Sequence, residues 1–153
     1  MGEDKSKLTE AEIETVLMEA QVGYLALARD GQPYLIPLNF IYSSGNIYFH
    51  SRTSGRKVET INLNPKAAFH AGAIGSLIAG KNPCKFNYNF CSVVIEGVIS
   101  EVRDLVEKEE ILELLVEKYA GNSVGRGKIS AKQLAGVNVY SLAPHIISGK
   151  KNT

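Results

Sequence analysis

Seven consecutive residues in the first half of the chain combine hydroxyl groups, a glycine and three positive charges: Ser51, Arg52, Thr53, Ser54, Gly55, Arg56 and Lys57. They follow two apolar segments, residues 37–40 and 47–49, and lead into a short segment with a helical pattern. The free N–H groups and the dipole at the start of a helix attract anions, and nearby hydroxyls and cations add to that attraction. Apolar strands beside such a position suit a flat, uncharged ring. The pattern therefore predicts a site for a phosphorylated aromatic cofactor.

The same cluster has a simpler interpretation, as the solvated start of a helix that happens to be basic. Positive side chains in the first turn of a helix oppose its dipole, so a bound anion would account for their position. The crowding of hydroxyl groups and of Gly55 around the cations favours the phosphate-binding interpretation.

A second, glycine-rich segment imitates a nucleotide-binding loop. Residues 75–81 fit the pattern G-x-x-x-x-G-K, but Asn82 takes the place of the Ser or Thr that would bind magnesium. Pro83 blocks the helix that must follow such a loop. The sequence thus argues against a nucleoside triphosphatase.

Residues that could bind a metal are few and poorly spaced: Cys84, Cys91, His50, His70 and His145. They form no C-x-x-C or H-x-x-x-H motif, so we expect no metal site and treat the cysteines as small apolar residues. His50 is a candidate pocket residue, although a histidine on a strand is as often only packed or exposed.

Length and charge restrict the class of protein further. The 153 residues suit one domain spanning residues 1–153. With 17 basic and 16 acidic residues the chain is nearly neutral, which argues against a general nucleic-acid-binding protein. The two cysteines and the charged residues 1–7, which lack the apolar region of a signal peptide, favour the cytoplasm. No segment reaches the ~18 apolar residues of a membrane span.

Helical spacing of apolar residues predicts three helices, over residues 8–20, 54–63 and 104–119. Thr9 and Glu12 form a capping box at the start of the first helix. Thr53 or Ser54 is expected to cap the second.

Alternating apolar residues predict six strands, at residues 24–28, 34–42, 47–51, 67–71, 90–102 and 137–147. Asp30 and Gly31 are a strong hairpin signal, and Gly97 marks a bulge or a close approach of backbones. Residues 72–83 and 121–135 have no clear pattern, apart from one helical turn in the second segment. Strands joined by hairpins, with helices at the periphery, predict an α+β fold built on an antiparallel barrel.

Five motifs occur in the order and spacing of a known family, at residues 37–40, 48–51, 55–57, 64–65 and 92–97. Through them the chain resembles the pyridoxamine 5'-phosphate oxidase-like flavoproteins, and specifically the branch that contains the nitroimidazole-resistance proteins. The likeness runs from about residue 8 to residue 150. It implies a six-stranded split β-barrel that forms a homodimer and binds FMN in the clefts between the subunits.

The resemblance also implies roles for individual residues. Those expected to hold the phosphate are Ser51, Gly55, Arg56 and Lys57, with Ser92 nearby. Those expected to line the edge of the isoalloxazine ring, mainly through their backbone, are Tyr34, Ile36, Pro37, Leu38 and Asn39. His50 occupies the position of a frequent pocket histidine and is the candidate catalytic residue.

Three departures from the oxidases proper bear on the reaction. Gly55 stands where those enzymes carry a serine, Asn39 stands where they carry a lysine, and residues 145–150 lack their motif for the substrate phosphate. The sequence therefore argues against oxidation of pyridoxamine phosphate.

The leading hypothesis is an FMN-dependent oxidoreductase that passes electrons from a reduced nicotinamide or another donor to a small acceptor such as a nitroaromatic compound. The alternatives are a flavin carrier or redox sensor without turnover, and a haem or other tetrapyrrole protein on the same barrel. The expected partners are a second copy of the chain and the small acceptor, with neither nucleic acid nor membrane.

Overall fold

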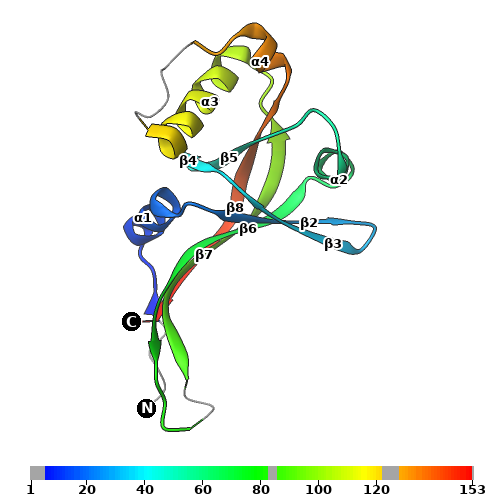
Figure 1. Cartoon of the computed structure of the whole chain (residues 1–153). Helices are drawn as coiled ribbons and strands as arrows, with labels where there is room; N and C mark the ends of the chain where they lie inside the picture. The colour runs from blue at the N-terminus through cyan, green and yellow to red at the C-terminus, as the bar shows by residue number, and fades with distance from the viewer. Residues whose placement is uncertain (1–5, 83–85, 122–127, 153) are drawn as a thin grey trace.

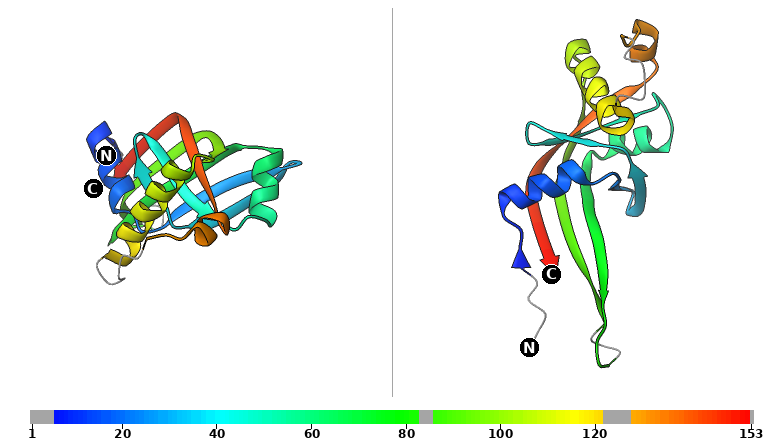
Figure 2. Two further views of the ribbon diagram at one scale, coloured as in Figure 1. Left: turned by 90° about the horizontal axis from the view of Figure 1, so that it is seen from above. Right: turned by 60° about the vertical axis from the view of Figure 1, so that its left-hand side comes forward.

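The computed structural model describes residues 6–82, 86–121 and 128–152. The strands are β1 (Ser6–Lys7), β2 (Gly23–Arg29), β3 (Gln32–Leu38), β4 (Ile41–Ser43), β5 (Asn46–Ser51), β6 (Lys66–Ile78), β7 (Asn87–Glu101) and β8 (Asn138–Asn152). The helices are α1 (Glu10–Glu19), α2 (Arg56–Leu63), α3 (Leu105–Ala120) and α4 (Ala131–Ala135). The α+β class is thus confirmed, with α1 and α2 on opposite sides of the strands (Figures 1 and 2).

All described strands belong to one antiparallel, eight-stranded sheet in the order β3-β2-β6-β7-β8-β5-β4, with β1 paired to β8. The sheet is not closed, because β3 and β4 are its two ends. The prediction of six strands was wrong in two places. The expected strand at residues 34–42 is two strands, β3 and β4, and β1 was not predicted.

Residues Asn39 and Phe40 link the two ends of the sheet, because the chain leaves β3 and enters β4 through them. The Phe40 side chain is fully buried and packs edge-on against Phe69. The Phe40 N–H donates to the Tyr119 hydroxyl at 2.9 Å, and that hydroxyl lies 3.0 Å from the carbonyl oxygens of Phe40 and Gln21. Tyr119 of α3 therefore supplies the hydrogen bonds that a regular ladder would have given Phe40.

The capping signals explain where most helices begin. In α1 the Glu12 N–H donates to Thr9 Oγ1 at 3.3 Å and the Thr9 N–H donates to Glu12 Oε2 at 2.8 Å, so the predicted capping box is confirmed. Asp104 accepts from the N–H groups of Val106 and Glu107 at the start of α3. The helical turn expected within residues 121–135 is α4, and residues 122–127 lie outside the described residues.

Strands β6 and β7 are longer than predicted and project from the body as a two-stranded arm (Figures 1 and 2). Residues 75–78, part of the segment that imitates a nucleotide-binding loop, belong to β6. The bulge expected at Gly97 is confirmed by the register shift against β8, where a Cβ on Gly97 would lie 2.1 Å from the Ala143 carbonyl oxygen. Pro83 and Cys84 fall outside the described residues.

The core lies inside the curved sheet. Its four largest fully buried side chains are aromatic and come from distant places in the chain: Phe40, Phe49, Phe69 and Tyr140. Leu17 of α1 is also fully buried in this core. A smaller cluster joins Ile111 and Leu115 of α3 to Tyr48 and Val139. Among the described residues, no helix combines the length and apolar character that a membrane crossing requires.

Candidate functional site

The predicted phosphate site lies at the start of α2, immediately after β5. Gly55 is the N-cap of this helix, and no side chain caps it, so the prediction that Thr53 or Ser54 would cap it was wrong. Gly55 has a φ of +112°, which side-chain-bearing residues rarely adopt, and no atom of the described residues other than its chain neighbours lies within 4 Å of the position a Cβ would take. The first N–H groups of α2 therefore lack a side-chain acceptor next to an open space, which is a geometry that suits an anion.

Two cations of the cluster belong to the first turn of α2. The Arg56 guanidinium carbon lies 4.1 Å from the centroid of the Tyr34 ring, which connects α2 to β3. The Lys57 amino group lies 5.8 Å from the centroid of the Phe49 ring, and burial lowers the pKa of Lys57. No carboxylate of the described residues forms an ion pair with Arg56 or Lys57. The charge of both side chains is thus available to a ligand.

Ser51 and His50 end β5 and point to opposite faces. Ser51 is buried, whereas His50 is exposed, as the alternation along a strand requires. The pKa of His50 is lowered, first by partial burial of the ring and second by the positive charge of Lys57. His50 is therefore in the neutral form near pH 7, in which one ring nitrogen donates and the other accepts.

Strand β3, predicted to line the flavin ring, is an edge of the sheet. It pairs with β2 on one side, and no strand of the described residues pairs with its backbone on the other side. Its side chains alternate: Tyr34, Ile36 and Leu38 pack against the core, whereas Pro37 is exposed, as is Asn39 directly after the strand. Backbone groups along this edge are free to bind the polar rim of a planar ligand.

The structure does not bring Ser92 together with the other predicted site residues of the same chain. Ser51 pairs with Asn138 at the start of β8, whereas Ser92 pairs with Lys150 near its end. Ser92 instead lies 3.0 Å from His70 of β6, between Ser92 Oγ and His70 Nε2.

A cavity of about 190 Å³ lies between the β2–β3 hairpin and α2. Tyr34 and Arg56 line it, together with four residues that the sequence did not predict as site residues: Arg29, Asp30, Gln32 and Thr60. The sequence marks Asp30 only as a turn residue, and no motif marks the other three. The cavity therefore lies between Arg56 of the predicted phosphate site and the hairpin.

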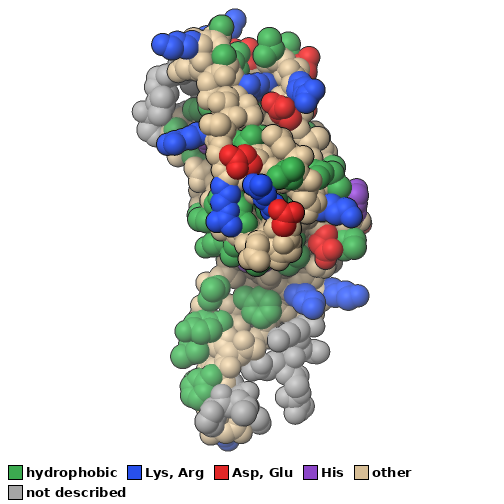
Figure 3. Space-filling view, turned by 90° about the vertical axis from the view of Figure 1, so that its right-hand side faces the viewer, with side chains coloured by type: hydrophobic (Ala, Val, Ile, Leu, Met, Phe, Trp, Pro, Cys, Tyr) green, Lys and Arg blue, Asp and Glu red, His purple; other side chains and the backbone are tan. Residues whose placement is uncertain are grey.

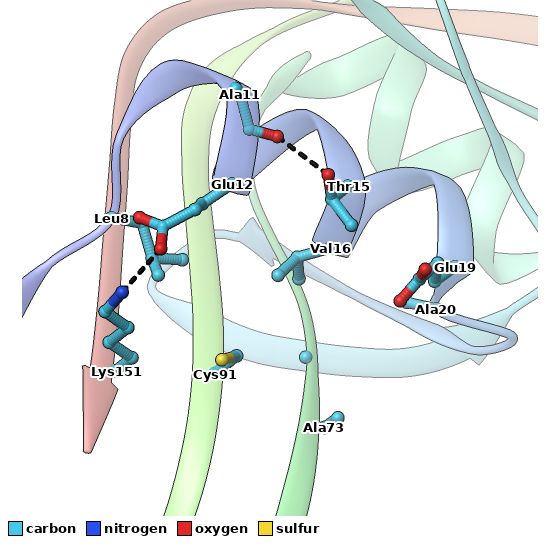
Figure 4. A pocket seen from close by; sticks show the side chains of 11 residues that line it. Leu8, Ala11, Glu12, Thr15, Val16, Glu19, Ala20, Ala73, Cys91 and Lys151 are labelled. Carbon is cyan, nitrogen blue, oxygen red and sulfur yellow. Dashed lines mark hydrogen bonds and ion pairs between the residues drawn. The ribbon is translucent and has the colours of Figure 1, made fainter. Parts of the chain in front are cut away.

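A larger cavity, about 410 Å³, lies beneath α1 and away from this cluster (Figure 4). Its walls are mostly apolar and include Val16, Ala73 and Cys91. An ion pair between Lys151 and Glu12 lies at one end, and the Thr15 hydroxyl donates to the Ala11 carbonyl. It contains none of the predicted site residues, so its size alone does not make it the functional site.

Comparisons with other proteins identify the family of this chain. The family profile described as pyridoxamine 5'-phosphate oxidase matches residues 9–151. An uncharacterized protein of Rhizobium meliloti (strain 1021) is 26% identical over 95 residues, which cover 62% of this chain. The match spans 56% of that protein's own length, so the chain corresponds to little more than half of it.

Solved structures share the fold. A candidate 5-nitroimidazole antibiotic resistance protein of Bacteroides thetaiotaomicron superimposes with a TM-score of 0.83 at 21% identity, over 99% of this chain and 89% of that one. An FAD- and haem-binding protein of Mycobacterium smegmatis gives 0.83 at 18% identity, over 97% and 73%. An FAD-binding protein of Mesorhizobium loti gives 0.71 at 26% identity, over 97% and 99%. Because the family profile covers nearly the whole chain, this protein belongs to the pyridoxamine 5'-phosphate oxidase family.

Proposed function

We propose that the chain binds FMN as a homodimer and uses it as an oxidoreductase that passes electrons to a small acceptor. The observation that carries the proposal is the start of α2, where an uncapped helix N-terminus meets Arg56 and Lys57, neither of which has a carboxylate partner among the described residues. Hydrogen bonds to a charged group are worth about 1.5–3 kcal/mol each, so two such cations can hold a phosphate firmly.

The choice of FMN among the flavins follows from charge. A phosphomonoester is a dianion at the end of the ligand, whereas the pyrophosphate of FAD must continue into an adenosine. The cluster at α2 offers two cations, helix N–H groups and the buried Ser51 hydroxyl to one phosphate. The relatives that bind FAD support a flavin in general, and the site itself favours the mononucleotide.

The remaining predicted residues would orient the ring. The unpaired backbone edge of β3, from Tyr34 to Leu38, can bond the polar rim of a flavin, and Tyr34 is itself fixed against Arg56. Bound flavin supplies the hydride and electron chemistry. His50, exposed beside Lys57, would donate a hydrogen bond to the acceptor in its neutral form and a proton in its protonated form.

Two alternative functions are compatible with the same fold. A flavin carrier or sensor needs the same phosphate site but no turnover. A haem protein is suggested by the relative that binds both FAD and haem, and the described residues include the three histidines His50, His70 and His145 as candidate ligands. We place the protein in the cytoplasm on the strength of its sequence.

The absorption spectrum of the purified protein tests the proposal first, because a flavin gives two bands in the near-ultraviolet and blue regions whereas haem gives one intense Soret band between them. Cofactor released by heat is then identified by chromatography against FMN, FAD and riboflavin. Oxidation of NADH or NADPH is measured in air, with and without a nitroaromatic acceptor. Equal affinity for FMN and riboflavin would refute the phosphate site, and tight FMN binding without any turnover would favour the carrier.

A further inference from the structure

The cavity beneath α1 lies apart from the proposed flavin site and has the size of a small-molecule site. Its volume of about 410 Å³ is well above the roughly 150 Å³ that holds a benzene ring. One wall is a face of α1, and the opposite wall is formed by β6, β7 and β8 (Figure 4). There is room for a ring with a short side chain.

The cavity exists because small residues face each other across it. Ala11 and Ala20 of α1 lie opposite Gly72 and Ala73 of β6. Gly72 has no space for a side chain, since a Cβ there would lie 2.3 Å from the Cys91 carbonyl oxygen. The gap between the helix and the sheet is therefore a consequence of the sequence on both sides.

The cavity is separate from the exposed apolar side chains of the arm. Ala73 and Cys91 are antiparallel partners, and Cys91 alternates with the buried Val93, so they continue the core face of the sheet. Ile74, the residue after Ala73, points to the other face and is 79% exposed. Figure 3, which views the molecule from the side away from α1, shows hydrophobic side chains along the arm. The apolar wall of the cavity thus belongs to the inner face of the sheet.

The charges at one end of the cavity balance each other. Lys151 of β8 forms an ion pair with Glu12, and the Glu12 carboxylate also accepts from the Thr9 N–H at 2.8 Å. This end has no net charge to offer a ligand.

The other end carries an uncompensated negative charge (Figure 4). Glu19, the last residue of α1, forms no ion pair within the described part of the chain. Its carboxylate lies at the negative end of the helix dipole, and the last turn of α1 contains no basic residue. One turn earlier, the Thr15 hydroxyl donates to the Ala11 carbonyl at 2.9 Å, so its oxygen is left as an acceptor. Both side chains at this end therefore accept hydrogen bonds, which suits a cationic donor.

We propose that this cavity is a further ligand site and that it takes a small organic cation with an apolar body. The ammonium group binds between the Glu19 carboxylate and the Thr15 hydroxyl oxygen. The apolar body lies against Val16 and Cys91. The inference does not depend on the proposed function, because none of these residues belongs to the cluster at α2 or to β3.

Three probes of one shape and different charge test the proposal: 3-phenylpropylamine, 3-phenylpropan-1-ol and 3-phenylpropanoate. NMR titration of the full chain near neutral pH and at low salt measures their affinities. A ligand of about ten non-hydrogen atoms should bind with a dissociation constant of about 0.1–1 mM. We expect the amine to bind about 3- to 10-fold more tightly than the alcohol, and the carboxylate to bind most weakly. Added salt should reduce the advantage of the amine, because Glu19 is exposed.

The thiol of Cys91 reports whether the probe occupies the cavity. In a Cys84→Ser background Cys91 is the only cysteine of the chain, and its alkylation by iodoacetamide is followed by mass spectrometry. The amine at ten times its dissociation constant should slow this reaction about tenfold, because that fraction of the sites is occupied.

Substitutions in the cavity separate the charge from the apolar wall. Glu19→Gln should weaken the amine about 3- to 10-fold and leave the alcohol unchanged. Glu14→Gln is the matched control on the same helix, because Glu14 is exposed and does not line the cavity, and it should change neither. Ala73→Leu fills the space and should abolish binding of the amine and the alcohol, with thermal denaturation as the check that the variant is folded.

The possible results are distinguishable from a failure of the proposed function. Equal affinity for all three probes, tighter binding of the carboxylate, or amine binding that Glu19→Gln leaves unchanged overturns the assignment of a cation. Absence of binding at about 10 mM of every probe, or alkylation of Cys91 that the bound amine does not slow, overturns the cavity as a ligand site. None of these results bears on FMN binding at α2.

Discussion

The guanidinium of Arg56 lies over the ring of Tyr34, with 4.1 Å between the guanidinium carbon and the ring centroid. This contact ties the first turn of α2 to the edge strand β3, so the two parts of the proposed flavin site are fixed relative to each other. The attraction of a cation to an aromatic face is worth about 0.5–1 kcal/mol at an exposed position. It positions the guanidinium but leaves its N–H groups free for a phosphate.

Removing either cation should weaken the binding of FMN and spare that of riboflavin. A charged hydrogen bond contributes about 1.5–3 kcal/mol, so Arg56→Ala or Lys57→Ala is expected to raise the dissociation constant of FMN about 10- to 100-fold. Quenching of flavin fluorescence measures both affinities. Arg103→Ala is the control and should change neither, because Arg103 is exposed and its one ion pair within the described part of the chain is with Glu101. A parallel loss of FMN and riboflavin binding would mean that the cations hold the fold and not the phosphate.

Gly55 should tolerate no side chain, although there is room for one. Its φ of +112° lies in a region essentially restricted to glycine, so Gly55→Ala is expected to lower the free energy of unfolding by about 1–3 kcal/mol or to shift the start of α2. FMN affinity should fall with it. Gly136→Ala is the matched control, because Gly136 ends α4 with a φ of −81° that alanine adopts freely. Urea denaturation measures the free energy of unfolding of both variants. Equal stability of the two would refute the role of the Gly55 conformation.

Tyr119→Phe should destabilise the link between the two ends of the sheet. It removes the hydroxyl that accepts from the Phe40 N–H at 2.9 Å and leaves this buried donor without a partner. The expected loss in free energy of unfolding is about 1–3 kcal/mol, seen as a fall in Tm of several degrees. In Tyr42→Phe the lost hydroxyl has no hydrogen-bond partner among the described residues, so that variant should unfold like the wild type.

The sequence predicted those features that depend on local chemistry. The capping box of Thr9 and Glu12, the Asp30-Gly31 turn and the bulge at Gly97 are each fixed by one or two residue types and were confirmed. The grouping of Arg56 and Lys57 at a helix start was also visible, because they are neighbours in the chain.

Features that depend on distant residues were missed. The break at Asn39 and Phe40 is stabilised by Tyr119, which is 79 positions away from Phe40, and apolar alternation runs through it without a signal. The length of the arm was hidden because its glycines resemble a loop, yet Gly72 is needed where a Cβ would lie 2.3 Å from the Cys91 carbonyl oxygen. The pairing of His70 with Ser92 depends on strand register, which composition does not reveal.

The final prediction concerns the charge and the role of His50. Burial and then the charge of Lys57 hold its pKa below the ordinary value of 6.5, so Lys57→Met should raise the pKa of His50, measured by NMR titration of the ring. Because the folded-state pKa is below the unfolded one, protonation favours unfolding, and stability is lost as the pH falls from about 6.5 through the folded-state pKa. His50→Gln should remove that part of the pH dependence in urea denaturation.

If His50 serves the acceptor, His50→Gln should also lower the rate of acceptor reduction while FMN affinity and dimerisation stay unchanged, because His50 and Ser51 point to opposite faces of β5. The protonated form of His50 can transfer a proton to the acceptor, whereas glutamine keeps a hydrogen-bond donor but cannot transfer a proton. We therefore expect a lower rate that has lost the pH dependence of the wild type below about pH 6.5. Full turnover in both His50→Gln and His50→Ala, or a loss that follows dissociation of the dimer, would make His50 a packing residue.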